Sequence, residues 1–294
     1  MPNFPDKLLF AIVLAILIFL FFHKYFALFK PQSNNNEVQP AENLQTNRNL
    51  FWGFDKENDK LDEIWLPEKS SNKNWWLNSG AYFYIKDFKG YTVQNELSDN
   101  DEWRLKYMHN TPSETDNGYH PQNIFRLISK AQFKDTEQEL HFIIHKYHLS
   151  ESENRNESNA VLLFSDYEDS DNLYYSGLRI DGTAIIKRKC ETRYETLLQA
   201  KILDGQYDKE ISPNLLNSNH EYALKVITTH DENDNANIKL YIKLSPEPDW
   251  KLIGDATDTN SCRPNTNSSV GIRTDFMDVE FTKYSVKTLK TTQE

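Results

Sequence analysis

The sequence predicts an all-β domain, an antiparallel sandwich of two sheets, behind one apolar N-terminal segment. Three observations predict this fold class. Between residues 81 and 289, many short runs alternate apolar with polar side chains. Turn-forming residues separate these runs at short spacing. After the N-terminal segment, no window keeps a helical period over three turns.

The N-terminal segment 8–29, LLFAIVLAILIFLFFHKYFALF, is the most apolar part of the chain. As a helix it would span roughly 33 Å, about the thickness of a bilayer's hydrocarbon core. Lys24 can reach the headgroups, and Tyr25 suits the interface. A cleaved signal peptide is the alternative, but no small-residue cleavage site follows the apolar run. We therefore predict a single-pass signal anchor with an extracytoplasmic domain, although the few flanking charges do not fix the orientation.

The segment 30–49 is polar, rich in Asn and Gln, and nearly free of large apolar side chains. Because such a segment buries too little apolar surface to fold, we expect a disordered stalk. Residues 50–290 are expected to form one large domain, followed by a short tail at 291–294. Two polar segments, 95–120 and 150–159, are expected to be long loops within it.

Charge and cysteine content limit the function classes. The chain has 33 basic and 44 acidic residues, a formal net charge of −11, which repels a phosphate backbone. We therefore exclude nucleic acid as a partner. The chain has two cysteines, Cys190 and Cys262, and no CxxC pair, which excludes a thiolate zinc site. One disulfide and two separate buried thiols both remain open, because pairing depends on the fold.

Two hairpins carry the strongest local signals. Runs at 220–229 and 236–244 alternate apolar with polar residues and flank an acidic tip, HDENDNAN. Runs at 173–180 and 183–189 flank Asp181-Gly182, which favours a tight turn because both turn positions can take a positive φ. Further strands are expected at 81–88, 123–133, 139–149, 160–167, 270–275 and 277–289.

Three stretches share a recognisable pattern: NGYHPQNIFRL at 117–127, DYEDSDNLYYSGLRIDGTAIIKRK at 166–189 and VGIRTDFMDVEFTKYSVKTL at 270–289. A strand ends in an acidic turn, Asp-Asn-aromatic-aromatic opens the next strand, and a tight Asp-Gly turn leads into a Lys-rich strand. This pattern resembles the concanavalin A-like jelly rolls, the lectin, glucanase and laminin-G-like superfamily. The resemblance implies a jelly-roll sandwich for most of 50–290. Its members include lectins, glycosidases, polysaccharide lyases and adhesion domains, so it leaves the function open.

Glycan binding without catalysis is the function we expect. It needs aromatic faces for sugar C–H surfaces and planar polar side chains for hydroxyls. The expected ligand-binding residues are Arg126, Asn172, Tyr174 and Arg179. Further aromatic candidates are Trp75, Trp76, Tyr82, Tyr84 and Tyr175. At least half of these aromatic side chains are expected in the core instead, and a purely structural or protein-adhesion domain is a further alternative.

A polysaccharide lyase on the same fold is the first enzymatic alternative. Removing the proton beside a uronate carboxylate needs a base and a cation that stabilises the developing charge. His120, Arg126 and Tyr175 are the candidates for these roles. The short motifs of alginate-lyase-like enzymes are not reproduced in order, so we expect no confident catalytic residue.

A glycosidase is the second enzymatic alternative. The glucanase branch of the resembled superfamily places alternating carboxylates on one strand. Here Asp278 and Glu280 alternate in this way, but Phe276 occupies the position of the first carboxylate. The broken pattern favours a domain that holds its ligand without cutting it.

Metal ligands give a weaker signal. In a strand, His141 and His145 would share a face and His148 would lie on the other, which breaks a three-ligand set. The tip at 230–235 is rich in oxygen atoms but lacks the Gly and closing Glu of an EF-hand loop. We expect no cofactor, with Ca²⁺ as the one candidate because it occurs in jelly rolls of this kind. No P-loop, dinucleotide fingerprint or nucleophile motif is present.

Overall fold

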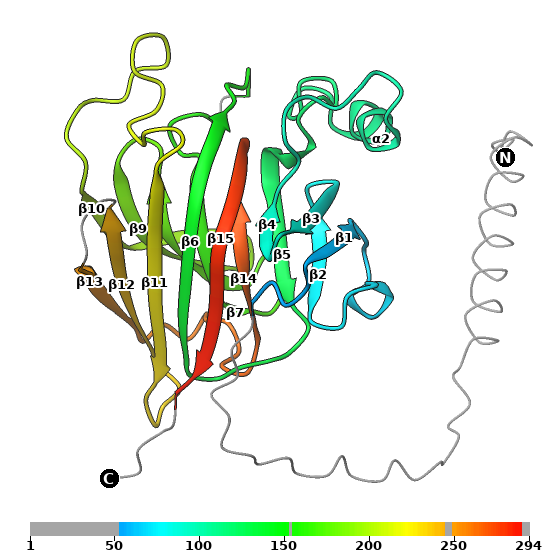
Figure 1. The fold of residues 1–294 in the computed structure, drawn as a ribbon. Helices are drawn as coiled ribbons and strands as arrows, with labels where there is room; N and C mark the ends of the chain where they lie inside the picture. The colour runs from blue at the N-terminus through cyan, green and yellow to red at the C-terminus, as the bar shows by residue number, and fades with distance from the viewer. Residues whose placement is uncertain (1–52, 153–154, 245–248, 290–294) are drawn as a thin grey trace, which may run out of the picture. The chain divides into compact units, whose positions relative to one another are not determined.

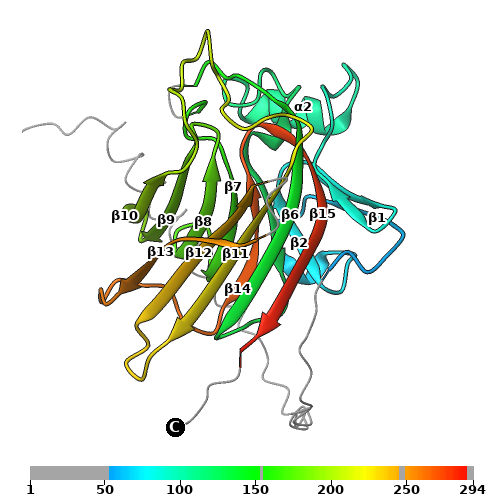
Figure 2. The same ribbon diagram turned by 60° about the vertical axis from the view of Figure 1, so that its left-hand side comes forward.

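The computed structural model describes residues 53–152, 155–244 and 249–289, which form a β sandwich (Figures 1 and 2). The predicted anchor at 8–29 and stalk at 30–49 lie outside the described residues, as does the tail. In the described ranges, no helix is long and apolar enough to cross a membrane. The anchor and the stalk therefore remain predictions.

Two antiparallel sheets make up the sandwich. In spatial order, the eight-stranded sheet contains β1 (Asn58–Asp62), β3 (Tyr82–Lys86), β4 (Lys89–Tyr91), β15 (Met277–Thr288), β6 (Thr136–Tyr147), β11 (Glu221–His230), β12 (Ala236–Leu244) and β13 (Lys251–Asp258). The seven-stranded sheet contains β10 (Arg193–Lys201), β9 (Thr183–Cys190), β8 (Leu173–Arg179), β7 (Ala160–Tyr167), β14 (Ser269–Thr274), β5 (Phe125–Ser129) and β2 (Trp75–Ser79). The predicted all-β, two-sheet fold class is confirmed for these residues.

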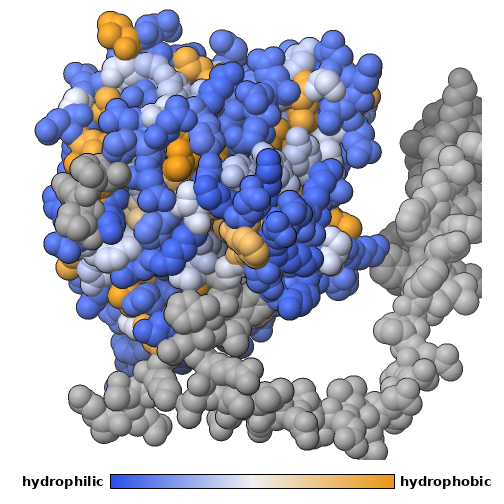
Figure 3. Space-filling model, in the orientation of Figure 1, coloured by the Kyte–Doolittle hydropathy of each residue, from blue (hydrophilic) through white to orange (hydrophobic). Residues whose placement is uncertain are grey.

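The core lies between the sheets because each strand turns one set of alternating side chains inward. On β11, Leu224 and Val226 are fully buried, and their neighbours Leu240 and Ile242 on β12 are buried opposite them. Large aromatic side chains fill the rest of the space, among them Trp75. The surface over β6, β11 and β15 is mostly hydrophilic (Figure 3). These strands therefore alternate as a half-buried antiparallel sheet should.

A helix occupies part of the segment 95–120, where the sequence predicts only a loop. This helix, α2 (Glu102–Asn110), begins at Asp101, whose carboxylate accepts hydrogen bonds from the backbone amides of Trp103 and Arg104. Trp103 is its only buried residue. With so little apolar surface turned inward, the helix leaves almost no periodic pattern in the sequence.

Two predicted strands are shorter than expected. The run 81–88 ends at Lys86 because Asp87 and Phe88 take positive φ angles of 54° and 62° and turn the chain from β3 into β4. The run 123–133 begins inside the 3₁₀ turn η2 (Pro121–Ile124), and only β5 is extended. A second 3₁₀ turn, η1 (Pro67–Lys69), precedes β2. Both predicted hairpins, β8–β9 and β11–β12, are confirmed.

The two cysteines form a disulfide, which settles the question that the sequence leaves open. Cys190 ends β9 of the seven-stranded sheet, and Cys262 follows β13 of the eight-stranded sheet, with their Cα atoms 6.0 Å apart. The bond therefore joins the two sheets covalently near one end. Because disulfides form and persist in oxidising compartments, it indicates an extracytoplasmic domain.

Candidate ligand groove on the seven-stranded sheet

A groove of about 620 Å³ lies on the outer face of the seven-stranded sheet. Its floor is apolar and belongs to a cluster separate from the main core. The floor residues are Leu162, Phe164, Leu173, Tyr175 and Ile185. Their chain neighbours Leu163 and Tyr174 point the other way, into the main core, because side chains alternate along a strand. The sheet thus carries apolar side chains on both faces.

Strand register arranges the groove residues in rows that cross the sheet. One row contains Arg126, Arg273, Leu162, Gly177 and Ile185, from β5, β14, β7, β8 and β9 in turn. The next row along these strands contains Ile128, Gly271, Phe164, Tyr175 and Lys187. Residues opposite each other across a pleated sheet point to the same side. Five strands therefore present one continuous surface.

One glycine in each row keeps the floor low. An ideal Cβ at Gly177 would lie 2.2 Å from the carbonyl oxygen of Val161, and at Gly271 one would lie 2.4 Å from that of Leu127. Such distances leave no room for a side chain, so the neighbouring backbones can approach only glycine. The rows therefore contain gaps between larger side chains.

The groove is strongly basic. Among the described residues, its lining has a single acidic side chain, Asp275, against six basic ones: Arg126, Arg155, Arg179, Lys187, Lys189 and Arg273. The whole chain carries a formal net charge of −11, so this basic surface is opposite in charge to the protein as a whole. Four cations have a carboxylate within 4 Å, with N–O distances of 2.9 Å for Arg179–Asp181, 2.7 Å for Lys189–Asp171, 2.8 Å for Arg273–Asp275 and 3.8 Å for Arg155–Asp275.

The other two cations, Arg126 and Lys187, make no ion pair within the described part of the chain. The Nε atom of Arg126 is buried and has no hydrogen-bond partner among the described residues. Burial is the main cause that lowers the pKa of the Arg126 guanidinium, and Arg273 opposite adds to it. Burial likewise lowers the pKa of Lys187, helped by Arg179 and Arg273. Both charges are therefore poorly compensated.

An exposed tyrosine stands at one side of the groove. Tyr194 of β10 is 59% exposed, and its ring meets the ring of Tyr175 edge-on with centroids 6.4 Å apart. The Nζ atom of Lys189 lies 5.0 Å from the Tyr194 centroid. An aromatic face bordered by hydrogen-bond donors can pack against the C–H surface of a sugar while its hydroxyls are bound.

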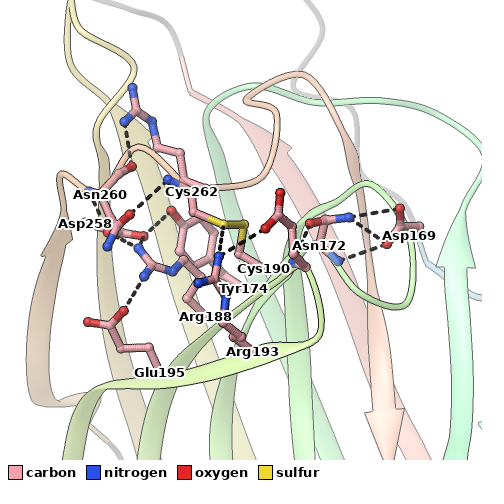
Figure 4. Close-up of a disulfide and its surroundings, with 12 residues drawn as sticks. Asp169, Asn172, Tyr174, Arg188, Cys190, Arg193, Glu195, Asp258, Asn260 and Cys262 are labelled. Carbon is pink, nitrogen blue, oxygen red and sulfur yellow. Dashed lines mark hydrogen bonds and ion pairs between the residues drawn. A yellow bond between two sulfur atoms is a disulfide. The ribbon is translucent and has the colours of Figure 1, made fainter.

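The structure brings two of the predicted ligand residues into the groove and leaves two outside its lining. Arg126 and Arg179 line it. Tyr174 is fully buried on the core face, and its hydroxyl donates to Asp258 at 2.7 Å. The side-chain amide of Asn172 donates to Asp169 in the turn before β8 (Figure 4). Both side chains lie near the disulfide.

The lyase candidates are divided in the same way. Arg126 and Tyr175 line the groove, whereas His120 lines a separate pocket of about 510 Å³. There the ring of His120 stacks on His148 with centroids 3.9 Å apart. Burial also raises the pKa of Tyr175 far above its ordinary value, so its hydroxyl keeps its proton. His120, the histidine candidate for the base, therefore does not line the same groove as Arg126 and Tyr175.

The two alternating carboxylates lie on β15, in the other sheet, and both are engaged. Asp278 accepts hydrogen bonds from Gln122 at 2.9 Å and from the backbone amide of Asn95 at 2.8 Å, and it also binds His148. Glu280 binds Lys89 at 2.7 Å and His145 at 2.9 Å. Neither carboxylate lines the groove.

Metal ligands do not gather in the described ranges, where no group of three or more His, Cys, Asp or Glu side chains could hold an ion. At the acidic tip, Asp231 accepts hydrogen bonds from the backbone amides of Asn233 and Asn235. Asp234 pairs with Lys134 at 2.9 Å. Asp231 thus stabilises the turn, and Asp234 forms an ion pair with Lys134.

Acid should weaken the domain through His120. Burial is the main cause that lowers its pKa from 6.5 to about 4, and His148 adds to it. Between these pH values the unfolded chain binds a proton that the folded chain does not. Lowering the pH from 6.5 to 4 should therefore reduce the free energy of unfolding by up to about 3 kcal/mol. Urea unfolding between pH 7 and pH 4 should show a smaller pH dependence for His120→Phe. The exposed His109→Phe should behave as wild type, and equal slopes in all three proteins would contradict this expectation.

No protein-family model matches the chain, and no curated protein matches its sequence. Similar solved structures include the carbohydrate-binding module CBM66 from Bacillus subtilis, at 15% identity and a TM-score of 0.41, covering 56% of this chain and 83% of that one. The exoplasmic/lumenal domain of VIP36, in its Ca²⁺/Man3GlcNAc-bound form, has 11% identity and a TM-score of 0.47, covering 80% and 90%. The Bacillus licheniformis beta-glucanase has 10% identity and a TM-score of 0.41, covering 80% and 100%.

At these identities and TM-scores, the likenesses give no indication of what the groove binds. The sheets themselves are informative about the fold. Two antiparallel sheets face each other around one core, and the β8–β9 hairpin with its Asp181-Gly182 turn and the long closing strand β15 lie where the sequence pattern predicts them. The described domain is therefore an antiparallel two-sheet sandwich, as the concanavalin A-like resemblance implies.

Proposed function

We propose that this chain is a glycan-binding module whose ligand lies in the groove on the seven-stranded sheet. The observation that carries the proposal is the combination in one open groove of an apolar floor, an exposed aromatic ring and several hydrogen-bond donors. Tyr194 supplies the ring, and Arg126 and Lys187 supply donors without an ion-pair partner in the described residues. Sugars bury C–H surface against aromatic rings and need donors for their oxygens.

The groove residues support binding without cleavage. Glycoside hydrolysis uses two carboxyl groups that flank the scissile bond. The single carboxylate of the lining, Asp275, is held by Arg273 and Arg155. Asp278 and Glu280 lie in the opposite sheet, where Asp278 pairs with His148 and Glu280 pairs with Lys89. We therefore favour a lectin-like module over a hydrolase or a lyase.

The predicted anchor at 8–29 and stalk at 30–49 would tether this module to a membrane. The disulfide supports an extracytoplasmic position for the domain. Retention of the full chain in the membrane fraction after alkaline extraction is the expected result, and release into the soluble fraction would contradict the anchor.

Replacing Tyr194 by Ala should weaken glycan binding roughly tenfold, about 1.4 kcal/mol, because the sugar loses its exposed stacking surface. The full chain in detergent is first screened on a glycan array, and affinity for the best ligand is then measured by calorimetry. The urea midpoint should not change, since the side chain is 59% exposed.

A matched control for this variant is Trp65→Ala, which removes another exposed aromatic side chain, 87% exposed, outside the groove lining. It should bind as wild type. Full affinity in Tyr194→Ala, or no binding to any glycan by the folded full chain, would count against the proposed function.

A further inference from the structure

We infer that the groove selects acidic glycans, oligosaccharides that carry carboxylate or sulfate groups, and that Arg126 and Lys187 bind two such groups on one chain. This inference rests on the proposed function and names the ligand class of the same groove. Both side chains line the groove, and neither has an ion-pair partner among the described residues.

The first argument is the register of two arginines. Arg126 and Arg273 lie directly opposite each other on β5 and β14. Like charges in this position repel and destabilise a sheet. Asp275 compensates Arg273 through two hydrogen-bond-length contacts, with 2.9 Å from Nε and 2.8 Å from Nη2. Arg126 has no such carboxylate in the described part of the chain, so a ligand anion beside it would supply the missing opposite charge.

The second argument is that a hydrogen-bond donor is left over. The Nε atom of Arg126 is buried without an acceptor in the described residues. A buried donor without a partner costs free energy, and a guanidinium fork fits a carboxylate or sulfate through two parallel bonds. A neutral hydroxyl would accept one bond but would not neutralise the charge. An acidic group satisfies both needs at once.

The third argument is distance. From β5 to β9 there are four steps between neighbouring strands, through β14, β7 and β8. At about 4.8 Å for each step, and with Lys187 one row further along its strand, the backbones at Arg126 and Lys187 lie roughly 20 Å apart. Between them lies the apolar floor with Phe164 and Tyr175. One acidic sugar ring cannot reach both cations, whereas an oligosaccharide lying across the strands can. The groove should therefore prefer longer chains over monosaccharides.

Charge elsewhere on the protein sharpens the selection. The chain as a whole is acidic, with a formal net charge of −11, so an acidic polymer is repelled by most of the surface. Only a polymer whose sugar rings pack on the apolar floor and on Tyr194 gains enough binding free energy to offset this repulsion. Nucleic acid carries a negative charge at every nucleotide. It meets the same repulsion from the protein and makes fewer packing contacts with the groove floor to offset it.

The test titrates the full chain with three sets of oligosaccharides, each as a series from monomer to hexamer: galacturonates, sulfated galactans and neutral mannans. Acidic hexamers should bind at least tenfold more tightly than neutral ones, and acidic monomers should bind weakly. Raising the salt concentration should weaken only the acidic ligands, because salt screens charge. The two acidic series show which group, carboxylate or sulfate, is preferred.

Variants locate the effect. Arg126→Gln and Lys187→Gln should each lower affinity for the acidic hexamer roughly tenfold and should weaken neutral binding much less, because the Gln amide can still donate to a hydroxyl but carries no charge. Lys209→Gln removes the same charge from an exposed site outside the groove lining and should have no effect. The urea midpoint of Arg126→Gln should equal or exceed that of wild type, because a like-charge contact is removed. This measurement excludes unfolding as the cause of weaker binding.

The outcomes separate the inference from the function on which it rests. Neutral binding that is lost in Tyr194→Ala, without a preference for acidic chains, would overturn the inference and leave the proposed function standing. Absence of binding to all three series would overturn the inference, and absence of binding to every glycan of the array would overturn both. Equal affinity for a single-stranded nucleic acid of the same charge would overturn the selection for glycans.

Discussion

Replacing Arg188 by Met should destabilise the domain by about 3–5 kcal/mol. The guanidinium of Arg188, on β9, lies buried between the sheets and donates to both carboxylate oxygens of Asp258 at 2.6 and 2.8 Å (Figure 4). It also pairs with Glu195 on β10. Asp258 lies in the opposite sheet, at the end of β13, and accepts a hydrogen bond from the hydroxyl of Tyr174. Without the guanidinium, a buried carboxylate loses its only cation among the described residues.

Urea unfolding measures this loss, and a second variant isolates its cause. The double variant Arg188→Met, Asp258→Leu removes the stranded charge together with the cation and should recover most of the stability. Arg193→Met is the control, because Arg193 and its partner Glu191 are both 73% exposed and an exposed pair contributes little. A double variant as unstable as the single one would show that lost volume, and not the unpaired charge, causes the effect.

Removing the disulfide should cost about 4 kcal/mol, because the bond closes a long loop in the unfolded chain. The two cysteines are separated by 72 positions in the sequence, and the bond joins the end of β9 to the segment after β13. The urea midpoint of Cys190→Ser, Cys262→Ser should therefore fall well below that of the oxidised protein. The covalent link between β9 of one sheet and the segment after β13 of the other is then lost.

A reducing agent provides the matched control for the disulfide. It should shift wild type to the midpoint of the double serine variant and leave that variant unchanged, since the chain has no other cysteine. If wild type unfolds at the same urea concentration with and without the reducing agent, the bond contributes no stability and the expectation fails.

Half-buried strands are the part of the fold that the sequence predicts well. The alternation on β11 and β12 and the Asp-Gly turn between β8 and β9 are local signals with direct structural causes. The edge strands β10 and β13 are mostly exposed and show no such alternation. Pairing with a neighbour keeps them extended, and pairing is not visible in a local pattern.

The groove is harder to predict because it depends on register. Tyr174 and Tyr175 are adjacent, and a single step decides which of them enters the core and which the groove floor. One signal was available: Ile185, Lys187 and Lys189 alternate on β9, which places two cations on one face. The opposition of arginines on β5 and β14, in contrast, requires the pairing of strands far apart in the sequence.

Two glycines in the rows that cross the groove help to fix its shape, whereas the side chains around them determine which ligand it binds. Because Gly177 and Gly271 are imposed by backbone contacts, the trough is a property of the main chain. The cations and tyrosines around it are side chains that can be exchanged without moving a strand. Divergent copies of this domain that keep both glycines should therefore inherit the same trough while acquiring different ligands. Substitution of either glycine should push the neighbouring strands apart and so distort the trough for every ligand alike.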